Sequence, residues 1–94
     1  MRVIRADEVK RFILSHLDIA FKENGLTEKE ITDDFDIMKR GIIDSIGFIQ
    51  LISAIEEQFG IEIDFEAMDT ENLTVIGSIS KYIEEFVKKA TNDA

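Results

Sequence analysis

Cysteine is absent from this chain of 94 residues, and histidine occurs once, as His16. The first absence excludes disulfides, thiolate metal sites and a cysteine nucleophile, and the second excludes metal sites or acid–base pairs built on two histidines. No apolar run is long enough to span a membrane, and the N-terminus, with Arg2, Arg5 and Asp7 spread through it, lacks the apolar region of a signal peptide. We therefore expect a cytoplasmic protein, and few enzyme mechanisms remain.

Positive charge is also scarce, since 11 Lys and Arg stand against 20 Asp and Glu and give a formal net charge of −9. This balance argues against a general nucleic-acid binder, because affinity for phosphate backbones comes from Lys and Arg. Between Gly41 and Ser80 there is no base, and the acids of this stretch are Asp44, Glu56, Glu57, Glu62, Asp64, Glu66, Asp69 and Glu71. Such a stretch is either a solvated face or a docking surface for basic partners.

Apolar residues recur at helical spacing in three stretches, which predicts an all-α fold. The main helices are expected over about residues 6–23, over 44–59 with Gly60 as the stop, and from Thr74 as N-cap onward. No repeat or linker divides the chain. We therefore expect a single domain over residues 1–94 that stands alone as a protein. Its core should span about residues 6–88, and residues 89–94 should form a frayed tail.

The connections between these helices carry weaker signals. The connection over residues 26–43 is long and rich in apolar residues, so we expect it to pack across the bundle. Its Thr27-x-x-Glu30 pattern has the spacing of a capping box and predicts a single turn. Residues 61–63 should form an extended connector. Asp64 can then cap a fourth, short helix over residues 65–68. The predicted architecture is a small bundle of three main helices plus one short helix.

The second predicted helix has two faces of different character. The inward face should carry Phe48, Leu51, Ile52, Ile55 and Phe59, and the outward face Ile46, Ile49, Gln50, Ser53 and Glu57. Singly exposed apolar residues are ordinary, but two isoleucines close together beside a serine are less so. We therefore expect a binding surface on the outward face, near the start of this helix.

Asp44 and Ser45 stand at the start of the same helix. Asp44 can cap the free backbone N–H groups, and Ser45 then falls in the first turn, where a phosphate on its hydroxyl would meet the positive end of the helix. Such a pair is most often a helix cap and nothing more. No base is available to activate Ser45 as a nucleophile, because His16 lies on the apolar face of the first helix and is expected at the core or its boundary. A functional Ser45 would thus be modified rather than catalytic.

The run Gly-Ile-Ile-Asp-Ser-Ile-Gly-Phe-Ile-Gln-Leu-Ile at residues 41–52 resembles the phosphopantetheine attachment segment of acyl carrier proteins. Residues 54–63 and 72–76 and also Ile79 match that family in the same order. The similarity covers about residues 35–87, and the first helix fits by its pattern. The resemblance implies a four-helix bundle of the acyl-carrier type.

The same resemblance implies a function. A 4′-phosphopantetheine would be joined to Ser45, with Asp44 as its motif partner, by a phosphopantetheinyl transferase that uses coenzyme A and magnesium. The arm would carry an acyl or aminoacyl group as a thioester, so the protein would be a monomeric carrier and not an enzyme. Loading and transfer enzymes with basic patches would dock on this helix, at Ile46, Ile49, Gln50, Ser53, Glu56 and Glu57. No protein metal site and no membrane insertion are implied.

The motif also bears on the pathway. Fatty-acid carriers tend to have an acid where Gly47 stands, a glutamate at Gln50 and a leucine at Ile46, and Lys39 and Arg40 add positive charge before the motif. The run is closer to that of D-alanyl carrier proteins of cell-wall modification, and specialised biosynthetic carriers use similar runs. We therefore expect a stand-alone specialised carrier, with a D-alanyl carrier or a carrier of fatty acid biosynthesis and lipid metabolism as alternatives.

Two other functional classes are alternatives to a carrier: a calcium-binding protein and an unmodified interaction module. Asp34-x-Asp36 is the start of an EF-hand pattern, but Met38 stands where an oxygen ligand is needed and Lys39 where a glycine is needed. An unmodified acidic interaction module fits the composition equally well. It makes no demand on Ser45, and this separates it from a carrier.

Overall fold

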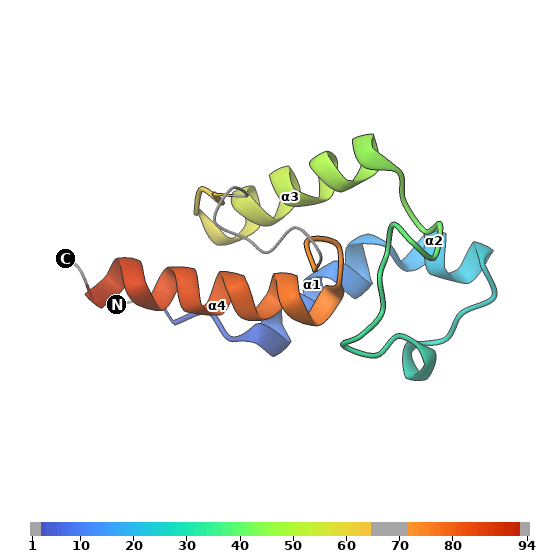
Figure 1. The fold of residues 1–94 in the computed structure, drawn as a ribbon, viewed down its shortest axis with the longest axis horizontal. Coiled ribbons are helices and arrows are strands. Elements are labelled where there is room, and N and C mark those ends of the chain that lie inside the picture. Colours follow the sequence, from blue (N-terminus) through green and yellow to red (C-terminus); the bar gives the residue numbers. More distant parts are fainter. Residues whose placement is uncertain (1–2, 65–71, 93–94) are drawn as a thin grey trace.

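The chain forms helices, and a long connection over residues 24–44 packs beside them, in a computed structural model that describes residues 3–64 and 72–92 (Figure 1). The elements are α1 (Ala6–His16), α2 (Asp18–Glu23), the 3-10 turn η1 (Glu28–Glu30), α3 (Ser45–Phe59) and α4 (Ile76–Asn92). α1 packs against both α4 and α3. In the described ranges there is no strand, apart from one isolated bridge, and no helix suited by length and apolarity to cross a bilayer. The predicted all-α bundle is confirmed.

The single N-terminal helix expected over residues 6–23 is instead two helices that meet at Leu17. Leu17 has φ −101° and ψ 14°, away from helical values, although its N–H still donates to Ile13 O (3.0 Å). Leu17 is buried, and beyond it Phe21 of α2 packs edge-on against Phe35, with ring centroids 5.8 Å apart. His16, expected at the core or its boundary, is exposed and stacks on Phe12 at 5.8 Å.

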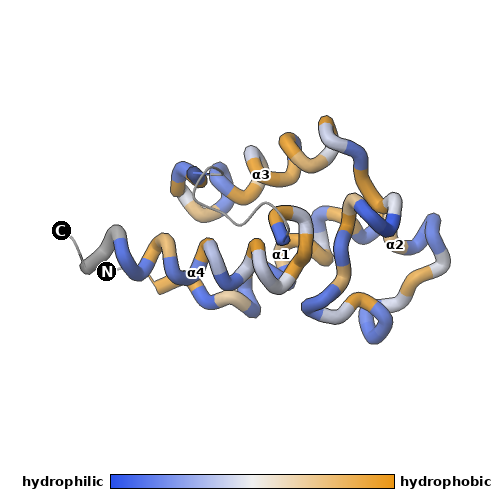
Figure 2. Tube along the Cα trace, in the orientation of Figure 1, coloured by the Kyte–Doolittle hydropathy of each residue, from blue (hydrophilic) through white to orange (hydrophobic). Residues whose placement is uncertain are grey.

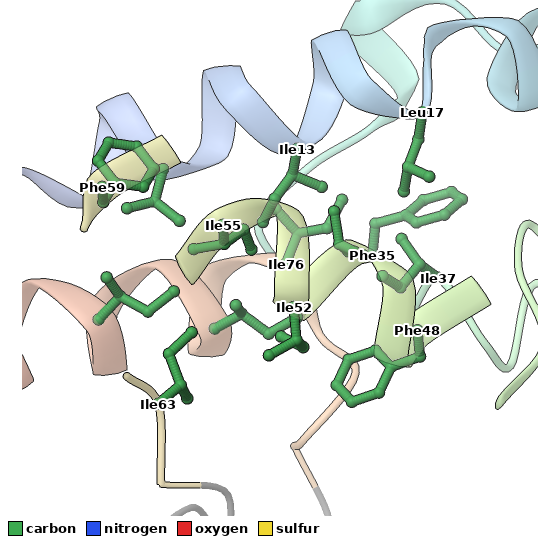
Figure 3. Close-up of a cluster of buried hydrophobic side chains, with 14 of the residues drawn as sticks. Ile13, Leu17, Phe35, Ile37, Phe48, Ile52, Ile55, Phe59, Ile63 and Ile76 are labelled. Atoms are coloured by element: carbon green, nitrogen blue, oxygen red, sulfur yellow. The ribbon is translucent and has the colours of Figure 1, made fainter. Parts of the chain in front are cut away.

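The core lies where α1, α3 and α4 face one another, and the long connection adds to it (Figure 3). In Figure 2 apolar and polar segments alternate along α1 and α4, as expected of amphipathic helices. The five residues predicted for the inward face of α3 are all buried: Phe48, Leu51, Ile52, Ile55 and Phe59. From the connection, Ile31, Phe35, Ile37 and Ile42 are buried as well. The expectation that this segment packs across the bundle is therefore confirmed.

The start of α4 is capped differently from the prediction. Thr74 was expected as its N-cap, but α4 begins at Ile76, and the Thr74 hydroxyl donates to Asp36 Oδ1 (2.6 Å). The free N–H groups of α4 are taken by carbonyls of the long connection: Ile76 N–H donates to Phe35 O (3.0 Å) and Gly77 N–H to Asp33 O (2.9 Å). A Cβ at residue 77 would lie 2.8 Å from Asp33 O, so this approach needs the glycine.

The turns at the ends of the other connections agree with the sequence in most respects. Gly60 ends α3 in the left-handed conformation with φ 66°, as predicted. The turn η1 forms where Thr27-x-x-Glu30 predicted one, but the Thr27 hydroxyl donates to the Glu30 carboxylate (3.1 Å) instead of capping N–H groups. Residues 61–64 form neither helix nor strand, and the short helix expected over residues 65–68 lies outside the described residues. α4 continues to Asn92, into the stretch where a frayed tail was expected.

Candidate functional site

Ser45 occupies the first turn of α3, behind an aspartate cap. Asp44 has extended backbone (φ −96°, ψ −172°), and its Oδ1 accepts a hydrogen bond from Gly47 N–H (2.8 Å), as predicted for an N-cap. Asp44 O accepts from Phe48 N–H (2.9 Å), which closes the first turn of the helix. The Ser45 side chain is exposed, and among the described residues its hydroxyl has no hydrogen-bond partner. The site therefore offers a free hydroxyl at a positive helix end.

A tight turn at the end of the long connection between α2 and α3 positions Asp44 and Ser45. Gly41 adopts φ 74°, and the N–H groups of Ile42 and Ile43 both donate to Ile37 O, at 2.9 and 3.2 Å. Ile42 is buried, which fixes the chain three residues before Ser45. The turn before Ser45 is thus held by its backbone hydrogen bonds and the buried Ile42, and the helix after Ser45 is held by its buried apolar face.

Asp36 connects this turn to Thr74, which directly precedes α4. Its Oδ1 accepts hydrogen bonds from Met38 N–H (3.1 Å), Lys39 N–H (3.0 Å) and the Thr74 hydroxyl (2.6 Å), and Ile37 N–H donates to Thr74 O (3.1 Å). Burial raises the pKa of Asp36, but these hydrogen bonds and the charge of Lys39 together hold that pKa below its ordinary value of 3.8. Asp36 is therefore a structural anion that positions the turn.

The sequence did not predict this role: Asp36 was considered only within an EF-hand pattern, which Met38 and Lys39 argue against. No group of three or more potential metal ligands occurs in the part of the chain that the structure describes. An aspartate before a turn is a local signal for a side chain that caps backbone N–H groups. Its second partner, Thr74, lies 38 residues further on, and no local pattern indicates that pairing.

The outward face of α3 carries the exposed residues that the sequence predicted. Ile46 is 68% exposed and Ile49 63%, and the polar residues Gln50, Ser53 and Glu57 are exposed as well. Glu56, named with them as a docking residue, differs: it is half-buried, and its Oε2 accepts a hydrogen bond from Ile63 N–H (2.8 Å). That bond holds the residues after Gly60 against the end of α3.

The charge beside Ser45 comes mainly from the turn that precedes it. The first turn of α3 contains no acidic residue. Lys39 and Arg40 are exposed, and the Arg40 guanidinium lies over the Phe35 ring, 4.7 Å from its centroid. Sequence reasoning noted both cations but not the stacking of Arg40 on a buried ring, because a cation–π contact at this spacing has no periodic signature.

The arrangement is suited to modification of Ser45 and not to catalysis by it. A serine nucleophile needs a base within hydrogen-bond reach. The lone histidine, His16, stacks on Phe12 in α1, and no described side chain bonds to the Ser45 hydroxyl. A phosphate on this oxygen, by contrast, would lie at the N-terminus of α3, where the helix dipole and free N–H groups favour an anion. The exposed hydroxyl leaves room for such a group, so the residues present fit a phosphodiester.

Comparison with known families agrees with this geometry. The family model of the phosphopantetheine attachment site matches residues 18–83, more than half of the chain. This match runs from the start of α2 to within α4, so it contains all of α3 together with the turn before it. Domains of this family hold a covalently bound 4′-phosphopantetheine. No solved structure matches the chain.

Proposed function

The chain belongs to the phosphopantetheine-attachment family of carrier proteins, and on that premise we propose that it carries an acyl or aminoacyl group as a thioester on an arm attached to Ser45. The observation that supports this most directly is the exposed hydroxyl of Ser45, which bonds to none of the described residues and lies in the first turn of α3, directly after the Asp44 cap. The arm's phosphate would be esterified to that hydroxyl, and its terminal thiol would hold the cargo.

The other serines are less suited to the attachment. Ser80 is buried and donates to Ile76 O (2.8 Å), and Ser78 is half-buried. Ser53 is exposed but lies in the middle of α3, where no helix end favours an anion. Ser15 precedes the matched residues 18–83. Among the serines of the chain, Ser45 alone combines exposure with a helix N-terminus.

Enzymes that load, modify and unload the arm would approach the outward face of α3. We propose that Ile46 and Ile49 supply apolar contacts there, with Gln50, Ser53 and Glu57 around them and Glu56 beside them. These encounters should be brief, because a carrier must leave each enzyme after its step. A phosphopantetheinyl transferase that uses coenzyme A and magnesium is the first partner. The cargo enzymes would follow it.

We further propose a specialised pathway in place of housekeeping fatty-acid synthesis. Gly47 stands where fatty-acid carriers tend to have an acid, and a Cβ at this position would lie 3.1 Å from Ile43 Cβ and 3.3 Å from Asp44 Oδ1. Any side chain there would require Ile43 to move by a few tenths of an ångström. Glycine fits this close approach without such a movement. A D-alanyl carrier is the alternative that fits the same motif.

The cargo can be tested on protein purified from its native cells under mildly acidic conditions, which preserve thioesters. Intact mass spectrometry should find the arm plus a small acyl or aminoacyl group, and neutral hydroxylamine should remove that group and leave the arm. A free amine on the cargo would select the aminoacyl form. A long saturated acyl chain would contradict the specialised pathway, and protein without an arm would contradict the carrier function itself.

A further inference from the structure

The face around Ser45 is polarised in charge along α3. From residue 37 to residue 55 the charged side chains are Lys39, Arg40 and Asp44, and acids resume at Glu56 and Glu57. Glu57 lies twelve residues after Ser45 on a helix that rises 1.5 Å per residue, so about 18 Å of helix separates them. Asp36 precedes this range and, with Asp44, matches the two cations in number, but Asp36 is buried whereas Lys39 and Arg40 are exposed.

Arg40 is an exposed cation in the turn before Ser45. Its guanidinium is held over the ring of the buried Phe35. No ion pair involving Arg40 is found within the described ranges, whereas three other cations there are paired: Lys10 with Asp33, Arg11 with Asp7, and Lys22 with Asp18. A positioned guanidinium retains its donors and its charge for a carboxylate from outside.

The nearby aspartates do not cancel this charge with ion pairs of their own. Asp36 is buried and its Oδ1 accepts three internal hydrogen bonds, while Asp44 accepts from Gly47 N–H as the helix cap. Lys39 is exposed, but its charge also acts on Asp36. The surface around Ser45 thus presents Arg40 in the turn before α3 and two exposed isoleucines, Ile46 and Ile49, in the first turns of the helix.

We propose that the phosphopantetheinyl transferase seats on this end of α3 through an apolar patch over Ile46 and Ile49 and an acidic side chain opposite Arg40. This inference rests on the proposed function. The transferase is the partner whose active site must reach the Ser45 oxygen itself. Arg40 is five residues from Ser45, so their Cα atoms lie within about 18 Å, and an interface of ordinary size, about 800 Å² on each partner, extends over that distance. A basic patch at this point would face Arg40 without a counter-ion, which costs binding energy.

The test is the rate of Ser45 modification by the transferase of the same organism, with coenzyme A and magnesium. Arg40→Glu should lower kcat/KM about tenfold through a higher KM for the carrier, and Arg40→Gln should lower it about threefold. Lys81→Glu on α4 makes the same charge change at an exposed lysine and should stay within about twofold. Added salt should slow the wild type more than Arg40→Glu, because screening removes an attraction that the variant lacks.

An Arg40→Glu rate equal to or above that of the wild type would overturn the proposal. So would an effect confined to the KM for coenzyme A, since that would place Arg40 against the phosphates of the coenzyme and not against the enzyme. Circular dichroism checks that each variant is folded, and Arg40→Gln retains a side chain able to pack on Phe35. If wild-type protein is never modified, the carrier function fails. If it is modified without dependence on residue 40, this inference alone fails.

Discussion

Two aspartates hold the start of α3 by accepting hydrogen bonds from the backbone. Asp44 satisfies Gly47 N–H at the helix end, and Asp36 satisfies two N–H groups of the preceding turn together with the hydroxyl of Thr74. The first role follows from sequence alone, because an aspartate before a helix is a common N-cap. The second requires the fold, because Thr74 reaches Asp36 only when α4 packs beside the connection.

The charge of Asp36 should make part of the stability depend on pH. Its pKa is lowered in the folded state by hydrogen bonds and by Lys39, which outweigh burial. The stabilisation is therefore complete above the ordinary carboxyl pKa of 3.8 and is lost as the pH falls through the lower folded value. Asp36→Asn should reduce the free energy of unfolding at neutral pH by about 1.5–3 kcal/mol. Its acid dependence should also be flatter than that of the wild type.

Urea unfolding at neutral pH and again below pH 3.8 measures both the loss of stability and its pH dependence. Thr74→Val should reproduce part of the loss in the free energy of unfolding, about 1 kcal/mol. The exposed Asp34 is the matched control, and Asp34→Asn should change the free energy by less than about 0.5 kcal/mol. An Asp36→Asn variant as stable as the wild type at neutral pH would contradict the structural role.

Among the elements, α3 was the most fully predictable from the sequence. Its apolar period, the Asp44 cap and the Gly60 stop lie within one short stretch, and the two faces are assigned as expected. The break at Leu17 was not predictable, because the apolar period continues through it. The start of α4 was misassigned because its free N–H groups are satisfied by Phe35 O and Asp33 O from the connection. Local patterns identify caps made by side chains, but not caps made by distant backbone.

Substitutions on the two faces of α3 should differ in their effect on stability. Ile46→Ser and Ile49→Ser remove exposed side chains and should change the free energy of unfolding by less than about 0.5 kcal/mol each. Ile55 is fully buried, and Ile55→Ala should cost about 2–5 kcal/mol. Denaturant unfolding of the three variants checks this, and a large loss in either serine variant would show that the outward face is packed in solution.

At the scale of the whole molecule, the net charge of −9 on 94 residues opposes folding. Added salt screens this repulsion, so the melting temperature should rise across a salt series and rise further with a divalent cation. Thermal unfolding followed by circular dichroism measures the shift. A melting temperature unchanged across the series would show that the acids are spaced widely enough to need no screening.

The central claim is that Ser45 carries the arm, and intact mass tests it most directly. The protein is incubated with coenzyme A, magnesium and a broad-specificity phosphopantetheinyl transferase, beside Ser45→Ala and the control Ser53→Ala, which removes an exposed serine from the same helix. We predict a gain of one phosphopantetheine on the wild type and on Ser53→Ala, and none on Ser45→Ala. A gain that persists in Ser45→Ala, or its absence from folded wild type with an active transferase, would contradict the account.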